Sequence, residues 1–305
     1  MLGSELEFHQ GYRSTYRIWD EVLGEAWPIE KGLYESLLQE KKMIAIAIKD
    51  KTIAYISYEI FECEVSIYVI VVVPEHRRSG LATTLLNRVM HEAMEQGVNK
   101  ATLCSFLSSP LWRAMPKDRV EAIAFFLAND WVNKGSSLDQ ICNIERYESP
   151  AFLARKHKPQ GMDLGFVRPE ETNVLLDFHS RYFPHWYPFY KDFIDQGKYE
   201  NIVVLRINNL IVATCMLHYP GEIFSGSNWV KLMGPDCGAP SVLGVANEHR
   251  GGSLAFFIFD FAIKKLKVKG AKNAFINQSD AAAIYGRFGF SVAWDYVHLS
   301  KYISI

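Results

Sequence analysis

The feature that most constrains the fold of this chain is a phrase of eight residues that occurs twice. "EHRRSGLA" spans Glu75–Ala82, and "EHRGGSLA" spans Glu248–Ala255, 173 positions later. Each phrase follows an apolar run and precedes a longer amphipathic stretch, a pattern that predicts a strand, a short basic loop and a helix. The chain has 305 residues, enough for two ordinary domains. We therefore expect a tandem duplication.

Two further pairs of segments support the duplication, each at an offset of 159. Ile48–Ala54 and Ile207–Ala213 each place a short polar turn between two apolar runs, which predicts a β-hairpin. Ala122–Trp131 and Ala281–Phe290 match near the end of each half. Because three segments match in the same order, chance similarity is the weaker interpretation.

The change of offset predicts a 14-residue insertion in each half, within Ser105–Val120 and within Tyr219–Ser241. We expect an N-terminal domain over residues 1–148, a linker over residues 149–162 and a C-terminal domain over residues 163–305. Each half alternates helices with strands and contains a hairpin. The expected fold class is mixed α/β, with a mainly antiparallel central sheet flanked by helices.

Composition narrows the function classes. The net charge is −1, from 33 basic and 34 acidic residues, which gives no electrostatic field to hold a nucleic acid. No apolar run approaches the ~20 residues of a membrane span, and the N-terminus has no signal-peptide core. The five cysteines include no CxxC pair, so we expect reduced thiols, no zinc site and a cytoplasmic location.

The two basic loops have the properties of an anion site. A strand that turns directly into a helix presents several unpaired backbone N–H groups at the helix start, where the helix dipole adds partial positive charge. Glycine lets the backbone approach a ligand closely, and arginine adds charge-assisted hydrogen bonds. Such a loop suits the pyrophosphate of a nucleotide cofactor.

The first loop resembles the signature of a known family. "RRSGLA" (Arg77–Ala82) fits the pattern [Q/R]-x-x-G-x-[G/A] of the GCN5-related N-acetyltransferases, or GNAT family. In the second half, Ala281, Tyr285 and the pair Gly289–Phe290 are similar to the last helix of that family. The resemblance covers nearly the whole chain as two copies. The second loop, "RGGSLA", departs from the signature because Ser253 replaces the glycine, which leaves its geometry open.

The resemblance implies acetyl-coenzyme A as cosubstrate and no metal. It implies cofactor contacts in both halves. In the second half these are Val245, Ala246, Arg250, Gly251, Gly252, Ser253, Leu254, Ala255 and Asn277, and in the first half Val73, Arg77, Arg78, Ser79, Gly80, Leu81 and Ala82.

The family resemblance also implies a general acid. A tyrosine at the position of Tyr285 protonates the departing thiolate in many members, whereas the first half has Phe126 there, which cannot donate a proton. We therefore expect the second half to be catalytic and the first to bind coenzyme A structurally or to be a degenerate copy. Tyr285 could also be an ordinary helix residue. The candidates for general base are Asp295, Asp236 and Asp280, the last of which could instead cap a helix.

The acceptor site is expected at the aromatic segment "RYFPHWYPFY" (Arg181–Tyr190). Aromatic faces with polar tips suit a sugar, and packing between the halves is the equal alternative. The insertion with "PLWRAMP" could reach the same cleft. The residues expected to contact substrate are Tyr182, His185, Trp186 and Tyr187.

As a whole the chain resembles tandem-domain bacterial acetyltransferases that modify glucosamine and glucosaminides and, more distantly, mycothiol synthase. This implies a small-molecule amine, most simply an amino sugar, as partner, with no nucleic acid or membrane. A homodimer stays open. The alternatives are an acyltransferase for an aminoglycoside, amino acid or polyamine, or a non-catalytic sensor of acetyl-coenzyme A or an amino sugar.

Overall fold

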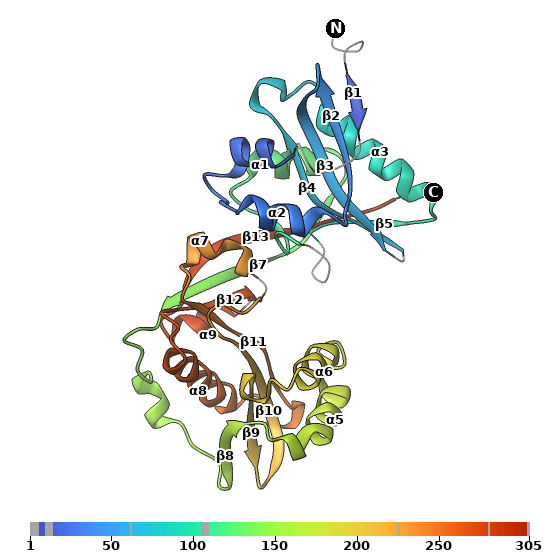
Figure 1. The fold of residues 1–305 in the computed structure, drawn as a ribbon. Helices are drawn as coiled ribbons and strands as arrows, with labels where there is room; N and C mark the ends of the chain where they lie inside the picture. The colour runs from blue at the N-terminus through green and yellow to red at the C-terminus, as the bar shows by residue number, and fades with distance from the viewer. Residues whose placement is uncertain are drawn as a thin grey trace. The chain divides into compact units, whose positions relative to one another are not determined.

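The chain forms two compact units, each described here by itself (Figure 1). The computed structural model describes residues 6–9, 15–61, 63–104, 110–224, 226–279 and 281–303. Unit 1 comprises Met1–Leu138 together with Trp294–Ile305, and unit 2 comprises Asp139–Ala293. The units thus divide the chain differently from the boundaries expected from sequence, because the last strand of each half contributes to both units.

Unit 1 contains the elements of the first half of the chain. Its helices are α1 (Thr15–Leu23), α2 (Lys31–Leu38), α3 (Leu81–Glu95) and α4 (Val120–Ala128), with a 3-10 turn at η1 (Pro74–His76). Its strands are β1 (Glu7–His9), β2 (Lys42–Ile48), β3 (Lys51–Phe61), β4 (Glu64–Val72), β5 (Lys100–Leu103), β6 (Met115–Pro116), the first part of β7 (Val132–Asn143) and the end of β13 (Ser291–Tyr302).

Unit 2 repeats the plan. Its helices are α5 (Thr172–Tyr182), α6 (Tyr187–Asp195), α7 (Val230–Met233), α8 (Leu254–Val268) and α9 (Ala282–Gly286), with 3-10 turns η2 (Ala151–Arg155), η3 (Pro169–Glu171), η4 (Tyr199–Asn201), η5 (Ser227–Trp229) and η6 (Asn247–His249). Its strands are β8 (Met162–Phe166), β9 (Ile202–Ile207), β10 (Leu210–His218), β11 (Cys237–Val245), β12 (Asn273–Ser279) and the end of β7.

The strand orders of the two sheets correspond. In unit 1 the order is β1-β2-β3-β4-β5-β13, and in unit 2 it is β8-β9-β10-β11-β12-β7. The pairs β4–β5 and β11–β12 are parallel, whereas the other pairs β1–β2, β2–β3, β3–β4, β5–β13, β8–β9, β9–β10 and β10–β11 are antiparallel. The mixed, mainly antiparallel α/β fold expected from sequence is confirmed.

The two predicted hairpins have the same turn. Lys49 and Asp50 have φ values of 48° and 63°, and Asn208 and Asn209 have 50° and 65°. Two consecutive left-handed residues between paired strands form a type I′ turn, which matches the twist of the strands. The polar turn residues of the sequence therefore set the hairpins directly.

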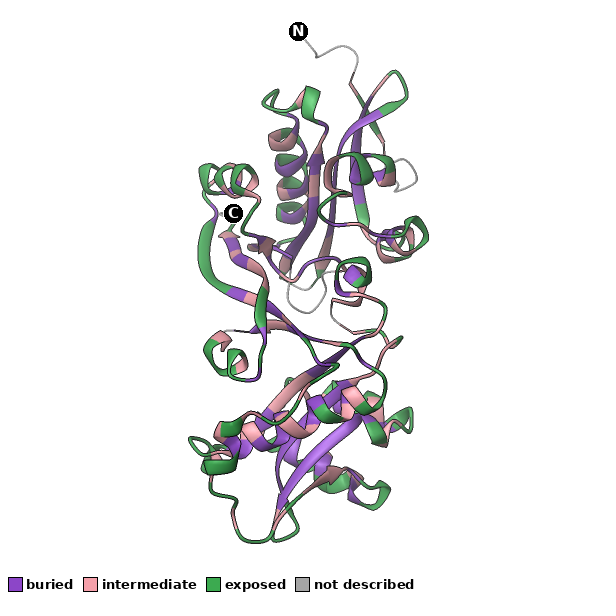
Figure 2. Cartoon of the chain, turned by 90° about the vertical axis from the view of Figure 1, so that its left-hand side faces the viewer, coloured by how far each residue is buried: buried purple, intermediate pink, exposed green. Residues whose placement is uncertain are grey.

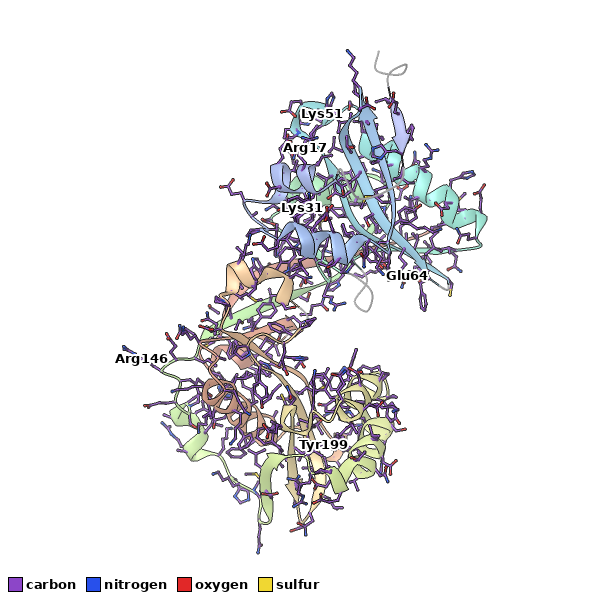
Figure 3. All side chains as sticks on the ribbon, in the orientation of Figure 1. Arg17, Lys31, Lys51, Glu64, Arg146 and Tyr199 are labelled. Atoms are coloured by element: carbon purple, nitrogen blue, oxygen red, sulfur yellow. The ribbon has the colours of Figure 1, made fainter. Side chains whose placement is uncertain are left out.

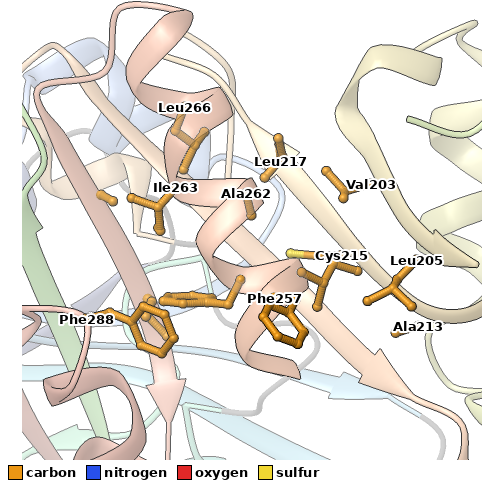
Figure 4. Packing of buried hydrophobic residues seen from close by; sticks show 14 of the residues in the cluster. Val203, Leu205, Ala213, Cys215, Leu217, Phe257, Ala262, Ile263, Leu266 and Phe288 are labelled. Atoms are coloured by element: carbon orange, nitrogen blue, oxygen red, sulfur yellow. The ribbon is translucent and has the colours of Figure 1, made fainter. Parts of the chain in front are cut away.

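Both faces of the unit 2 sheet are buried, and alternate residues of its strands point to opposite faces. Figure 2 colours the buried residues of these strands purple. Val203 and Leu205 of β9 pack in the cluster that contains α8, whereas Val204 packs in the cluster that contains α5 and α6. In Figure 4, Phe257 and Ile263 of α8 are seen within the first cluster. The sheet is thus covered by helices on both faces.

The outer surfaces of the helices in unit 1 are charged. Arg17 on α1 and Lys31 on α2, labelled in Figure 3, have side chains that are 46% and 64% exposed. An ion pair formed by a side chain as exposed as these contributes at most about 1 kcal/mol to stability. Within the described ranges, no helix combines the length and apolarity needed to cross a membrane.

Candidate functional site: a cavity beside the first basic loop

The strand before each basic loop separates from its parallel neighbour. In unit 1, β4 pairs with β5 from Glu64↔Lys100 to Ile67↔Leu103, and β4 then continues to Val72. A β-bulge lies at this point, because Ser57 faces Val69 while Tyr58 faces Ile67, which leaves Tyr68 as the extra residue. A bulge bends its strand and interrupts the ladder, so it opens the sheet here.

Unit 2 has the equivalent irregularity. β11 pairs with β12 at Cys237↔Asn273 and Gly238↔Ala274 and then continues to Val245. Between Thr214↔Gly244 and Met216↔Ser241, one residue of β10 faces two of β11. The doubled residues are Val242 and Leu243, which lie just beyond Ser241, the counterpart of Tyr68, and before the second basic loop.

Ligand pockets in proteins measure about 300–1,000 Å³. Unit 1 contains a cavity of about 680 Å³ at the opened strands. It is lined by β4 from Ile67 to Val72, by the basic loop with the start of α3, and by residues of α4. Trp112 and Met115 of the sequence insertion also border it. The insertion was expected at the cleft of the aromatic segment, but the cavity that it borders here is lined by no residue of Arg181–Tyr190.

The loop of unit 1 is shaped as an anion cradle. Gly80 is the N-cap of α3, with φ 84° and ψ −1°, and a Cβ added there would meet nothing within 4 Å. The first N–H groups of a helix have no partner within the helix, so those at the start of α3 can receive an anion through the open space above Gly80.

Arginines flank this cradle. The guanidinium groups of Arg78 and Arg77 lie 3.4 Å and 3.9 Å from the carboxylate of Glu121, and the Arg78 side chain is 89% exposed. Exposed pairs of this kind are weak. Both arginines can therefore exchange Glu121 for a phosphate at little cost.

The two loops share their backbone pattern up to the arginine. Val73 N–H donates to Ile53 O, and Ala246 N–H donates to Val212 O, each at 2.9 Å. Arg77 Nε donates to Val72 O at 3.3 Å, and the corresponding Arg250 Nε donates to Val245 O at 3.0 Å.

The loops differ at the helix cap. Ser253, the N-cap of α8, has φ −98°, whereas Gly80 has φ 84°. The left-handed conformation favours glycine, so the replacement of glycine by serine changes the backbone at the point nearest the cradle. This is the physical effect of the departure from the signature.

The expected cofactor residues of unit 1 mostly border the cavity. Arg77, Arg78, Gly80, Leu81 and Ala82 line it, while Val73 is buried below the loop and the Ser79 hydroxyl donates to the His76 carbonyl. Those of unit 2 lie together around the second loop. They are Val245, Ala246 and Leu254, which are buried, and Arg250, Gly251, Gly252, Ser253 and Ala255; Asn277 lies on β12.

Tyr285 lies on α9 and is half-buried, with its ring 4.9 Å from that of Phe259 and 6.3 Å from that of Phe290. Its counterpart Phe126 on α4 is fully buried and borders the unit 1 cavity. The position is thus aromatic in both units, with a phenol only in unit 2.

The proposed bases are held by lysines. Asp295 belongs to unit 1, not to the unit of Tyr285, and its carboxylate lies 2.8 Å from Lys117 Nζ. Asp236 precedes β11, at the opposite end of that strand from the second loop, and lies 2.6 Å from Lys272 Nζ. Asp280 is outside the described residues. Neither described aspartate is brought to a basic loop.

The aromatic segment lies beside the second loop. The Tyr182 hydroxyl donates to the Glu248 carboxylate, and the Arg250 guanidinium lies 5.7 Å from the centre of the Phe183 ring. Trp186 stacks on Phe183 with ring centres 4.7 Å apart. His185 is exposed, and Tyr187 begins α6 half-buried. Tyr182, Phe183 and Trp186 thus form an aromatic wall next to the basic loop of unit 2.

Sequence reasoning missed Tyr68. It occupies the bulge, borders the cavity and donates a hydrogen bond to Glu59. A single tyrosine within an apolar run carries no sequence signal for a bulge, so only the strand register could reveal it.

Comparisons with known proteins agree with this geometry. The Acetyltransferase (GNAT) family model matches residues 11–110. A search of curated protein sequences found no match. The two units have the fold of tandem GNAT proteins, and the family model matches a stretch within the first half of the chain.

Solved structures cover both halves. A GCN5-related glucosamine N-acetyltransferase region of a fungal multi-domain GH3 β-N-acetylglucosaminidase is 23% identical with a TM-score of 0.85, over 97% of this chain and 38% of that chain. A GCN5-related N-acetyltransferase from Sphaerobacter thermophilus is 14% identical with a TM-score of 0.73, over 100% and 98%. A tandem GNAT protein of the clavulanic acid biosynthesis pathway is 12% identical with a TM-score of 0.63, over 99% of each chain.

These similarities establish the fold. The chain spans 38% of the length of the fungal protein, so the activities of that whole protein do not transfer with the fold. The more distant resemblance to mycothiol synthase stays a prediction.

Proposed function

We propose that this chain transfers the acetyl group of acetyl-coenzyme A to the primary amine of a small molecule, with glucosamine or a glucosaminide as acceptor. The observation that carries the proposal is the unit 1 cavity, which combines opened strands, an uncovered glycine at a helix start and two exposed arginines. In this arrangement the loop would hold the pyrophosphate, and the opened strands would receive the arm that carries the thioester.

The acceptor class rests on two supports. The structural relative with a TM-score of 0.85 is described as a glucosamine N-acetyltransferase region. The charged residues around the cavity include both signs, with Asp118 and Glu121 beside Arg77, Arg78 and Arg119. A polyamine would need a strongly acidic site, so an uncharged or singly charged amine fits better.

A second assignment places the chemical step in unit 2, with Tyr285 as general acid. It is favoured by the phenol of Tyr285 at the position where unit 1 has Phe126, and by the aromatic wall beside the second loop. A cytoplasmic location and a homodimer stay predictions from the sequence and the proposed cosubstrate.

The test is release of free thiol from acetyl-coenzyme A in the presence of glucosamine, a glucosaminide, an aminoglycoside, an amino acid and a polyamine. We expect the amino sugars to give the highest kcat/KM. A different preferred amine would change the acceptor but keep the reaction. Binding of acetyl-coenzyme A without thiol release for any amine would instead support the sensor.

A further inference from the structure

A tyrosine that lines the unit 1 cavity forms a connected cluster with a glutamate and a lysine. The Tyr68 hydroxyl donates to the Glu59 carboxylate. Lys41 Nζ donates to both oxygens of Glu59, each at 2.9 Å, and also lies 5.5 Å from the centre of the Tyr68 ring. The phenol is therefore held in one orientation by two charged neighbours.

Tyr68 lies on β4 at the end of the cavity away from the basic loop. Tyr68 is the bulge residue at which β4 separates from β5, it borders the cavity, and it is 1% exposed. From Tyr68 to Val72 the strand extends ~13 Å toward the basic loop, at ~3.3 Å per residue. Coenzyme A is an elongated molecule with its pyrophosphate and its thiol far apart. A cofactor whose pyrophosphate lies at the loop can thus place its thioester near Tyr68.

The electrostatics keep Glu59 ionised at this end of the cavity. Burial alone would raise the pKa of Glu59, but the hydrogen bonds from Tyr68 and Lys41 outweigh burial and hold this pKa below its ordinary value. Glu59 is therefore a carboxylate at neutral pH. It draws on the phenolic proton, which makes the Tyr68 oxygen a better acceptor for a second proton.

The Cys104 thiol also lines the cavity near Tyr68, with Sγ 3.6 Å from the Tyr68 carbonyl oxygen, and the other ionisable groups, which include Asp118 and Arg119, lie elsewhere on the wall. His76, Arg77 and Arg78 belong to the basic loop, and Glu121 belongs to α4. Phe126, which takes the place of the family tyrosine, has no proton to exchange. Unit 1 thus lacks the general acid that the resemblance implied for the thiolate, and the proton of the attacking amine needs a separate acceptor.

Resting on the proposed function, we propose that Tyr68 is a catalytic residue of unit 1 that accepts the proton of the attacking amine and passes its own phenolic proton to Glu59. The amine nitrogen forms a bond to the thioester carbonyl carbon, and the carbon–sulfur bond breaks with its electron pair leaving on sulfur. The products are the amide, the coenzyme A thiolate and a protonated Glu59, which then returns its proton to solvent. Lys41 is a positioning residue that holds the Glu59 carboxylate.

A second cluster of the same three residue types offers a matched control for Tyr68. Tyr58 donates to the Glu92 carboxylate, which also lies 2.6 Å from Lys42 Nζ. This second tyrosine–glutamate–lysine cluster joins β3 to α3, and Tyr58 does not line the 680 Å³ cavity. Tyr58→Phe removes the same chemical group from the same kind of cluster.

The experiment compares wild type, Tyr68→Phe and Tyr58→Phe for kcat in thiol release with glucosamine and, separately, for acetyl-coenzyme A affinity by calorimetry. We expect Tyr68→Phe to lower kcat about 10²-fold with the Kd for acetyl-coenzyme A within about twofold, and Tyr58→Phe to keep kcat within about threefold. Glu59→Gln, which keeps the size of the side chain, should lower kcat at least about tenfold. This variant tests the proposal if Tyr68→Phe fails to fold.

The outcomes separate the two proposals. If wild type releases thiol while Tyr68→Phe and Glu59→Gln match its kcat, the role of Tyr68 is refuted and the proposed function stands. If both tyrosine variants lose activity equally, the clusters are structural and the assignment is also overturned. If wild type releases no thiol with any amine, the proposed function fails, and the role of Tyr68 fails with it.

Discussion

Unit 2 contains a buried ion pair whose energy can be tested through pH. Glu171 accepts hydrogen bonds from Arg206 Nε at 2.7 Å and Nη2 at 2.5 Å, and from the Arg168 backbone at 2.8 Å. The side chains of Arg206 and Glu171 are only 3% and 11% exposed. The hydrogen bonds from Arg206 are the main cause that lowers the pKa of Glu171 from 4.5 to about 2.

The sign and size of the effect follow from this lowered pKa. The stabilisation is fully present above pH 4.5 and is lost as pH falls toward 2, because protons then bind more readily to the unfolded chain. The shift corresponds to about 3 kcal/mol, and partial solvent screening reduces this to on the order of 2 kcal/mol. Glu171→Gln should cost on the order of 2 kcal/mol at neutral pH, since the buried Arg206 then keeps only the carboxylate of Asp163, at 3.0 Å and 63% exposed, as its ionic partner.

Urea unfolding followed by tryptophan fluorescence between pH 7 and pH 3 measures this directly. We expect the free energy of unfolding to fall less steeply with decreasing pH for Glu171→Gln than for wild type, by about 2 kcal/mol over the range. Glu170→Gln is the control, because Glu170 is 70% exposed, and its curve should run parallel to that of wild type within about 0.5 kcal/mol. Parallel curves for Glu171→Gln and wild type would refute the reasoning.

Three further substitutions test other parts of the structure. Gly244→Ala would place a Cβ 2.6 Å from Phe183 and 2.9 Å from Trp186, so we expect thermal unfolding to show a loss of about 1–3 kcal/mol in stability. The control Gly286→Ala, where the Cβ meets nothing within 4 Å, should change stability little, and equal effects would contradict the packing. Leu299→Ala, at a 2% exposed position of β13, should lower the free energy of unfolding by about 2–5 kcal/mol. Tyr302→Ala on the same strand, at a 73% exposed position, should lower it by about 0.5 kcal/mol or less, and the reverse order would contradict the orientation of this strand. Tyr285→Phe should keep the kcat of thiol release within about threefold, because we place the chemistry in unit 1; a drop of about 10²-fold would move it to unit 2.

Local patterns predicted much of the fold. The hairpins and the helices α3 and α8 follow from periodicity and turn residues close in sequence. Gly97 and Gly270, which follow these helices, have φ values of 75° and 91°, as is common where glycine ends a helix. The basic loops were predicted because their chemistry lies within a few consecutive residues.

Long-range pairing could not be predicted in the same way. β7 and β13 are the last strands of similar halves, so the sequence does not say which sheet each one completes. In the structure Ser300 of β13 pairs with Thr102 of unit 1, while Asp139 of β7 accepts a hydrogen bond from Gln278 N–H in unit 2. This exchange puts Asp295 in unit 1, and strand register, invisible in the sequence, places the bulge at Tyr68.

The most direct measurement is calorimetric titration of acetyl-coenzyme A into wild type and three glycine variants. Gly80→Ala and Gly251→Ala place a methyl group in each basic loop, at φ 84° and 80°, and Gly97→Ala introduces the same strain, of about 1 kcal/mol, at φ 75° after α3. A Cβ at any of the three positions would meet nothing within 4 Å in the protein itself. We predict that Gly80→Ala weakens binding at least about tenfold, while Gly251→Ala and Gly97→Ala stay within about twofold of wild type. Weakening by Gly251→Ala with an unchanged Gly80→Ala would show that the second loop, not the first, holds the cosubstrate.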